Sequence, residues 1–229
     1  MNRTAIRISA PTDGLLSGLE GEPLEALLGA AATRQFPAGA ALFHQGDAPS
    51  HLFQLCTGLV KMTQISSSGA QTMLRLMGPG DVVGCVAVFQ QFPFPATATT
   101  SQEATAFSWG AGPIRNLIAR YPAIAANALK STGDRAKEMV ERVAETTNKD
   151  VEQRIASVLL RLAAQMGRAA QSCIDLELPE IRKDIAGMAG VTYFTVSRTL
   201  AKWQKQGLVR NGRERILIVA PEKIADIAG

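Results

Sequence analysis

Residues 180–203, with the sequence EIRKDIAGMAGVTYFTVSRTLAKW, hold two short helical patterns on either side of a glycine turn. Gly190 stands where a tight turn between helices demands a positive φ angle, a conformation that glycine adopts without steric cost. Thr192 follows at a position from which its hydroxyl can cap the second helix. The stretch therefore predicts a helix-turn-helix. In its second helix, over residues 193–203, the expected buried stripe is Val196, Leu200 and Trp203.

The chain continues past this motif into a short hairpin. Gly207 breaks the helical pattern, residues 210–213 form an expected hairpin tip with two arginines, and residues 216–219 supply an apolar return strand. The module is therefore expected to be winged. Basic side chains at the tip of the wing suit contacts with phosphates, which fix position but carry little sequence information.

The net charge of +4 is unevenly distributed. Residues 1–148 contain 11 basic and 11 acidic side chains, whereas residues 149–229 contain 13 and 9. On charge alone, a polyanion partner and a solvated basic face explain this excess equally well. Combined with the helix-turn-helix and the basic wing, it favours double-stranded DNA as the partner. The predicted DNA-binding residues are Arg182, Thr192, Tyr193, Phe194, Thr195, Ser197, Arg198, Lys202 and Arg213.

The first half of the chain has a different pattern. Between residues 34 and 109, turn residues recur at intervals of about 8 to 12 residues, as in a small all-β sandwich or barrel. The expected strands lie over residues 52–55, 59–65, 72–77 and 104–109. A short amphipathic helix is expected before them, over residues 23–33, with Pro23 near its first turn.

No strand pattern remains between residues 113 and 148, and Pro122 opens a long helical stretch. Apolar and small residues recur there at alternating spacings of three and four, which are the a and d positions of a short coiled-coil seam. We therefore expect two such helices to pair in a homodimer, and a single helix packed on its own β domain is the alternative. The predicted dimer interface consists of Leu129, Thr132, Ala136, Met139 and Val143. A further helix is expected over residues 151–166.

Four segments carry a resemblance that covers nearly the whole chain. They are LFHQGD at 42–47, LFQLCTGLVK at 52–61, GPGDVVG at 78–84, and the stretch from DIA at 184–186 through Gly190 to TVSR at 195–198. The chain resembles the CRP/FNR family of bacterial transcription regulators. The resemblance implies an α+β architecture: a β-roll effector domain like a cyclic-nucleotide-binding jelly roll over residues 1–112, a dimerisation helix over 113–148 and a winged helix-turn-helix over 149–229. It also implies a homodimer that binds a roughly palindromic DNA site and contacts RNA polymerase.

Two features depart from the pattern of that family. In its cyclic-nucleotide-binding members a glutamate binds the ribose and an arginine pairs with the phosphate, but here these positions hold Cys85 and Pro95. Without a cation, the phosphate would lose its charge-assisted hydrogen bonds, so cyclic AMP is not the expected effector. Phe194 stands where members usually carry a glutamate that accepts a bond from cytosine. We therefore expect a different base pair there, with Phe194 on a thymine methyl and Arg198 still bidentate to guanine.

The expected effector pocket is apolar. The resemblance places GCVAVF at 84–89 and FPFPAT at 92–97 around it, with residues of the long helix opposite. Such a lining suits an apolar small molecule, or a haem that senses a gas, better than a phosphate ester. The segment FPFPATA is also similar to the branch of the family that responds to nitric oxide, carbon monoxide or low oxygen. If the pocket is instead filled by its own side chains, the protein is a regulator that needs no ligand. The predicted pocket residues are Gly84, Cys85, Val86, Phe89, Phe94, Ala96, Thr97, Arg135, Met139, Val140 and Val143.

Few residues are suited to cofactor or catalytic chemistry. Three scattered cysteines do not supply the roughly four ligands of an iron–sulfur cluster, and no metal site is predicted. His44, His51 and Cys85 are better explained as surface, structural and packing residues than as ligands. No nucleophile with a base, an oxyanion hole or a phosphate-binding loop is recognisable, so the chain is not expected to be an enzyme.

The expected location is the cytoplasm, without a membrane partner. No signal sequence is recognisable, and no apolar run approaches the roughly 18 residues of a membrane span. Outside DNA binding, the remaining alternative is a small-molecule-binding module whose C-terminal part contacts another protein.

Overall fold

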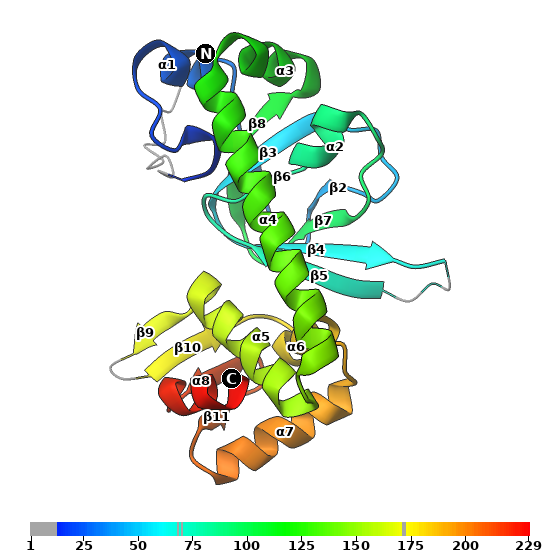
Figure 1. Cartoon of the computed structure of the whole chain (residues 1–229), viewed down its shortest axis with the longest axis vertical. Helices are drawn as coiled ribbons and strands as arrows, with labels where there is room; N and C mark the ends of the chain where they lie inside the picture. Colours follow the sequence, from blue (N-terminus) through cyan, green and yellow to red (C-terminus); the bar gives the residue numbers. More distant parts are fainter. Residues whose placement is uncertain (1–12, 68, 70, 171–172) are drawn as a thin grey trace. The chain divides into compact units, whose positions relative to one another are not determined.

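The computed structural model describes residues 13–67, 69, 71–170 and 173–229 (Figure 1). The architecture is α+β, as expected, with a β-rich N-terminal half, a long helix and a C-terminal helix-turn-helix. The chain divides into two compact units. One contains the described residues up to Lys61 together with Met77–Ala136, and the other contains Met62–Leu76 together with Lys137–Gly229.

Two four-stranded sheets form the β-roll. The first has the order β1 (Ala32–Phe36), β8 (Ala104–Gly110), β3 (His51–Thr57), β6 (Val82–Val83), and its neighbouring strands are antiparallel. The second has the order β2 (Ala41–Phe43), β7 (Thr97–Thr100), β4 (Val60–Ile65), β5 (Gln71–Met77). Five successive residues of β3, from Leu52 to Cys56, are buried, so this strand is covered on both of its faces.

Short helices pack on the first sheet. They are the 3₁₀ helix η1 (Gly14–Leu16), α1 (Gly21–Gly29), α2 (Cys85–Gln90) and α3 (Ala111–Arg120). Buried polar side chains fix two of them to the sheet. Trp109 of β8 donates its indole N–H to the carbonyl of Leu27 in α1 at 2.8 Å. Gln54 of β3 accepts from the N–H of Leu15 in η1 at 2.8 Å and donates to the carbonyl of Asp13 at 2.7 Å.

The strands expected from the sequence are confirmed, but the first helix is shorter than expected. The prediction of a helix over residues 23–33 is wrong at its end, because α1 ends at Gly29 and β1 begins at Ala32. The run of alanines there has no period that separates helix from strand. Pairing with β8, in which Ala32 lies opposite Ser108, decides the conformation.

Helix α4 spans Pro122–Asn148, 27 residues, and is separated from α3 by an extended residue, Tyr121. At 1.5 Å per residue it is about 40 Å long. Ile124 and Ala128 are buried against the chain's own β-rich unit. The stripe predicted from the a and d spacing is mostly exposed, with Leu129 at 73 %, Met139 at 68 % and Val143 at 64 %. Ala136 is exposed as well, and Thr132 is half-buried.

The C-terminal part of the second unit contains four helices and a sheet. The helices are α5 (Val151–Met166), α6 (Ile181–Ala189), α7 (Tyr193–Lys205) and α8 (Pro221–Ala228). The sheet has the order β11 (Val209–Asn211), β12 (Arg215–Ile218), β10 (Cys173–Glu177), β9 (Arg168–Ala170). Helix α5 covers the expected residues and begins with a capping box between Asp150 and Gln153. The segment after α5 forms the short strand β9, for which no strand was predicted from the sequence.

Residues 62–76 of β4 and β5 belong to this second unit by their contacts. Met73 of β5 is buried, and a Cβ atom placed on Gly187 of α6 would lie 3.4 Å from its Cβ and backbone nitrogen. A larger residue at position 187 would therefore press on the strand.

Two glycines in the β-roll offer a matched test of backbone strain. Gly58 and Gly39 have φ angles of +80° and +81°, but a Cβ on Gly58 would lie 2.4 Å from the carbonyl oxygen of Glu103, whereas nothing lies within 4 Å of one on Gly39. We expect Gly39→Ala to cost about 1–2 kcal/mol of unfolding free energy from φ alone. Gly58→Ala should cost several kcal/mol because the overlap adds to the strain. Urea unfolding of both variants measures the difference, and equal losses would contradict the steric account.

Candidate nucleic-acid interface

The recognition helix α7 begins at the residues that its cap dictates. Thr192 has an extended backbone, and its hydroxyl accepts a hydrogen bond from the N–H of Thr195 at 3.2 Å. The hydroxyls of Thr192 and Thr195 lie 2.9 Å apart and share a hydrogen bond. Gly190, which ends α6, has a φ angle of +64°. Both the cap and the glycine turn predicted from the sequence are confirmed.

One face of α7 is buried and the other is exposed. Val196, Leu200 and Trp203 are buried as expected, together with Thr199. On the other side Phe194 is 80 % exposed, Tyr193 is 44 % exposed, and Arg198 is exposed. Thr195 and Ser197 lie between the two faces and are half-buried. The residues predicted to contact base edges thus lie on a face that the chain's own core leaves open.

The wing is fixed to the helix-turn-helix by three side-chain contacts. Arg182, in the first turn of α6, donates to the carbonyl of Gly212 at the tip of the wing at 3.0 Å. Asn211 donates from its side chain to the carbonyl of Leu200 in α7 at 3.1 Å, and its N–H donates to the side chain of Gln204 at 3.0 Å. Arg182, predicted to bind DNA, therefore also positions the wing that carries the exposed Arg213.

The basic residues of this surface fall into two groups. Lys202 forms an ion pair with Glu152 of α5 at 2.6 Å, and Arg215 makes two hydrogen bonds to Asp175 at 2.6 and 2.5 Å. These bonds from Arg215 lower the pKa of the Asp175 carboxyl. Within the described part of the chain, no acidic side chain forms an ion pair with the exposed residues Arg198, Lys205, Arg210 and Arg213. The unpaired cations thus lie on α7 and the wing.

Arg154 connects the junction between α4 and α5 to the helix-turn-helix. Its Nε donates to the carbonyl of Ala189, the last residue of α6, at 3.1 Å, and its Nη1 donates to the carbonyl of Lys149 at 3.3 Å. Arg154 could not be predicted from the sequence, because its two partners are backbone carbonyls and leave no signal in side-chain spacing. Glu152 leaves no local signal for a different reason, because its side-chain partner Lys202 lies 50 residues away along the chain.

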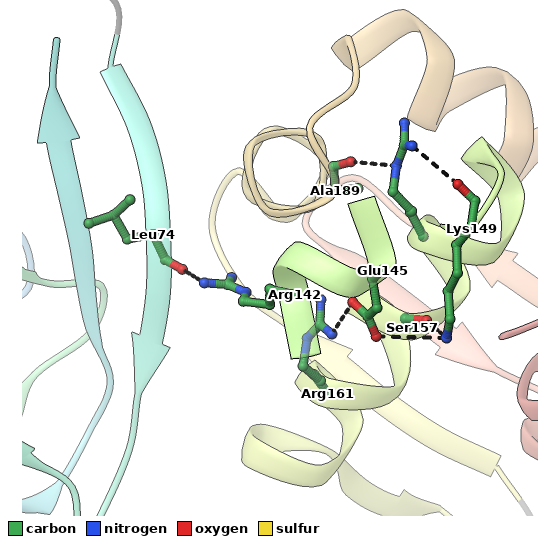
Figure 2. A network of polar contacts seen from close by, with 8 residues as sticks. Leu74, Arg142, Glu145, Lys149, Ser157, Arg161 and Ala189 are labelled. Carbon is green, nitrogen blue, oxygen red and sulfur yellow. Dashed lines mark hydrogen bonds and ion pairs between the residues drawn. The ribbon is translucent and has the colours of Figure 1, made fainter. Parts of the chain in front are cut away.

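The C-terminal half of α4 carries a network of charged side chains (Figure 2). Glu145 binds Arg161 of α5 at 2.7 Å, and Lys149 donates to the hydroxyl of Ser157 at 3.0 Å. Arg142 donates to the carbonyl of Leu74 in β5. Burial is the main cause that lowers the pKa of Arg142, and the charge of Arg161 lowers this pKa further. The network holds α4, α5 and β5 together within the second unit.

The residues predicted to line an effector pocket form two close groups in the first unit. Gly84, with a φ angle of +85°, lies against the ring of Phe94, which is buried and stacks on Phe43 with ring centroids 3.7 Å apart. Cys85 is fully buried, and its Sγ lies 3.7 Å from the hydroxyl of Thr132. The other predicted pocket residues in the first unit differ in burial. Ala96 is buried, whereas Val86, Phe89, Thr97 and Arg135 are half-buried.

Burial raises the pKa of the Cys85 thiol, whereas the hydroxyl of Thr132 and the charge of Arg135 act in the opposite direction with smaller effect. Cys85 is therefore a neutral thiol near pH 7. Met139, Val140 and Val143 belong to the second unit, where all three are exposed.

Neither histidine lies in a cluster of metal-binding side chains. His44 is exposed, and His51 is half-buried, with its Nδ1 bonded to the hydroxyl of Ser50 at 3.1 Å. Burial lowers the pKa of His51. Among the described residues, no three His, Cys, Asp or Glu side chains come together as metal ligands would. In the same part of the chain, every helix is too short or too polar to cross a membrane.

Comparison with known proteins identifies both halves of the chain. Residues 33–121 match the cyclic nucleotide-binding domain, and residues 153–227 match the Crp-like helix-turn-helix domain. The chain is a CRP/FNR family transcription regulator. Proteins of this family are not enzymes, and the expectation that the chain has no catalytic activity is confirmed on that ground.

Relatives from several bacteria match most of the chain. A CRP-like cAMP-activated global transcriptional regulator of Mycobacterium tuberculosis is 28 % identical over 212 residues, which cover 93 % of this chain and 95 % of the relative. The transcriptional activator protein FnrL of Cereibacter sphaeroides is 25 % identical and covers 86 % and 80 %. The structure of FixK2 from Bradyrhizobium japonicum has the same fold, with a TM-score of 0.76 at 18 % identity over 87 % of this chain and 98 % of that protein.

The contacts of Arg154 lead to a first prediction for this CRP/FNR regulator. Arg154→Ala leaves the carbonyls of Lys149 and Ala189 without their donor, which we expect to cost about 1–3 kcal/mol. The loss should appear as faster amide hydrogen exchange in residues 186–195, measured by mass spectrometry. Lys223→Ala in α8, where Lys223 is exposed, is the matched control. Unchanged exchange in residues 186–195 of the Arg154 variant would contradict the bridging role.

Proposed function

We propose that this regulator binds a specific, roughly palindromic site in double-stranded DNA as a homodimer and controls transcription through contact with RNA polymerase in the cytoplasm. The observation that carries the proposal is the open face of α7, where Arg198 is exposed and unpaired by any acidic residue of the described chain. Such an arginine can form two hydrogen bonds to a guanine in the major groove. The basic wing supplies phosphate contacts that fix the helix in register.

The homodimer is supported by the apolar stripe of α4. Leu129, Met139 and Val143 expose most of their surface to solvent on one side of a long helix, and they recur at coiled-coil spacing. Charged residues such as Lys130 and Lys137 flank the stripe and are exposed. A second copy of the helix would bury the stripe and place two recognition helices at the two halves of a palindromic site.

The side chains of the first unit support an apolar molecule as the effector. They do not support cyclic AMP. The group consists of the stacked rings of Phe43 and Phe94 and the neutral thiol of Cys85. Arg135 is the cation whose charge acts on Cys85. Haem has weaker support, because its candidate ligands are an exposed His44, a His51 already bonded to Ser50 and a thiol that burial keeps protonated.

A second candidate is a regulator of the same fold that needs no ligand. It is favoured by one observation: Phe94 stacks on Phe43, and Cys85 contacts Thr132, so the chain's own side chains occupy the place of the expected pocket.

The reading of guanine by Arg198 is testable by substitution. We expect Arg198→Ala to lower affinity for the selected site by 1–3 kcal/mol, about 5- to 150-fold, while affinity for unrelated DNA changes little. Arg210→Ala is the control: as a phosphate contact, it should weaken binding to all sequences and reduce the slope of log affinity against log salt by about one. Fluorescence anisotropy at several salt concentrations measures both. Equal loss on every sequence for Arg198→Ala would show that this residue does not read a base.

The proposed effector class is tested by ligand-induced changes in melting temperature. A ligand that binds only the folded protein raises Tm, so cyclic AMP should leave both Tm and DNA affinity unchanged. A haem titration without oxygen, followed by spectra with carbon monoxide, tests the gas-sensing alternative. A clear rise of Tm with cyclic AMP would contradict the proposal, and a stoichiometric haem band that shifts with carbon monoxide would replace the apolar molecule by haem.

A further inference from the structure

The two side chains that begin the recognition helix form an exposed aromatic pair. Tyr193 and Phe194 occupy the first two positions of α7, with ring centroids 6.0 Å apart and ring planes at 83°, an edge-to-face arrangement. At 80 % exposure, Phe194 leaves more of its surface in water than any other large apolar side chain in the described residues. The edge of Tyr193 restricts the orientations open to the ring of Phe194.

The core of the second unit does not explain this exposure. The same helix buries four side chains on its opposite face, from Val196 to Trp203, so the helix is already anchored without the aromatic pair. An exposed phenylalanine leaves apolar surface in water, and that surface becomes favourable only when a partner covers it. The cations nearby identify the partner: Arg198 lies one turn further along α7, and Arg210 and Arg213 extend from the wing.

We propose that Tyr193 and Phe194 form a reader of thymine 5-methyl groups, which makes this regulator select a thymine beside the guanine read by Arg198. The proposal rests on the proposed function, since it requires α7 to lie in the major groove. The methyl of thymine is the one apolar group that a base pair presents there. Phe194 supplies the apolar surface, and Tyr193 holds its ring.

The composition of α7 also weighs against recognition of cytosine. Residues 193–205 contain no acidic side chain that could accept a hydrogen bond from the cytosine amino group. In the first turn, the hydroxyls of Thr192 and Thr195 bond to each other, and the Thr192 hydroxyl also accepts from the N–H of Thr195. A cytosine at this position would bring its amino group against the ring of Phe194 without a carboxylate to accept its hydrogen bond, and thymine has no such amino group.

The distance between Phe194 and Arg198 along α7 predicts the distance between the thymine and the guanine in the DNA site. Phe194 and Arg198 are four residues apart and therefore lie on the same face, about 6 Å apart along the helix axis. Successive base pairs are about 3.4 Å apart. The selected thymine should thus lie within about two base pairs of the guanine in each half-site.

The test uses the full-length protein and chemically altered DNA. A site is first selected from a random pool, and each thymine is then replaced singly by deoxyuridine, which removes only the 5-methyl group. At the thymine within two base pairs of the guanine, loss of one methyl should weaken binding about fourfold. The same replacement elsewhere in the site is the control. With Phe194→Ala, thymine and deoxyuridine should bind equally, while salt-dependent binding to unrelated DNA persists.

A complementary arm restores the methyl. In a site that carries cytosine at the predicted position, 5-methylcytosine should recover about fourfold in affinity for the wild type and nothing for Phe194→Ala. Selection of a site without that thymine, or identical affinities for thymine and deoxyuridine at every position, overturns the proposal while leaving the regulator a DNA-binding protein. Failure to bind any DNA in a salt-dependent manner would overturn the proposed function itself, and this inference with it.

Discussion

The position of α7 depends on hydrogen bonds to carbonyl groups at the C-terminal ends of α4 and α6. The last carbonyls of a helix have no partner within it and carry a partial negative charge. Arg154 donates to such carbonyls at two helix ends, at Lys149 after α4 and at Ala189 of α6. One guanidinium thereby joins the long helix to the turn that precedes α7. Lys202 and Glu152 make a second link, from α7 itself to the first turn of α5.

These links connect the long helix to the surface proposed to bind DNA. Helix α4 holds β5 through Arg142 and α5 through Glu145, and α5 in turn holds both helices of the helix-turn-helix. Every step is a hydrogen bond or an ion pair between named atoms. In this structure, α5 is therefore the element that contacts both α4 and the helix-turn-helix.

Local signals explain why the second unit was predicted well from the sequence. Helix α5 has a capping box at Asp150 and a clear period, and α7 has a threonine cap after a glycine with a positive φ angle, so both begin where the sequence indicates. The short strands β2 and β6, of three and two residues, lack any period and form only by pairing with partners far along the chain. The end of α1 at Gly29 was missed for the same reason, because the pairing of β1 with β8 outweighs the helical preference of alanine.

The residues of the candidate site differ in the same way: some follow from local sequence signals, and others depend on partners far along the chain. Arg198 and Phe194 could be predicted as exposed because their positions in a helix determine which way they face, whereas Arg154 and Glu152 contact partners 35 and 50 residues away. Arg182 was identified for its charge, yet its bond to Gly212 shows a contribution to the shape of the wing that charge alone does not reveal.

Thr132 belongs both to the proposed dimer seam of α4 and to the surroundings of Cys85, where the effector is proposed to bind. It occupies a position of the proposed dimer seam, and its hydroxyl donates to the carbonyl of Ala128 at 2.9 Å while lying 3.7 Å from the thiol of Cys85. A molecule that entered beside Cys85 would have to displace the thiol or the hydroxyl, because Cys85 is fully buried and has no free surface to offer. Among these residues of the proposed dimer seam, Thr132 is half-buried and contacts Cys85, whereas Leu129 and Ala136 are exposed.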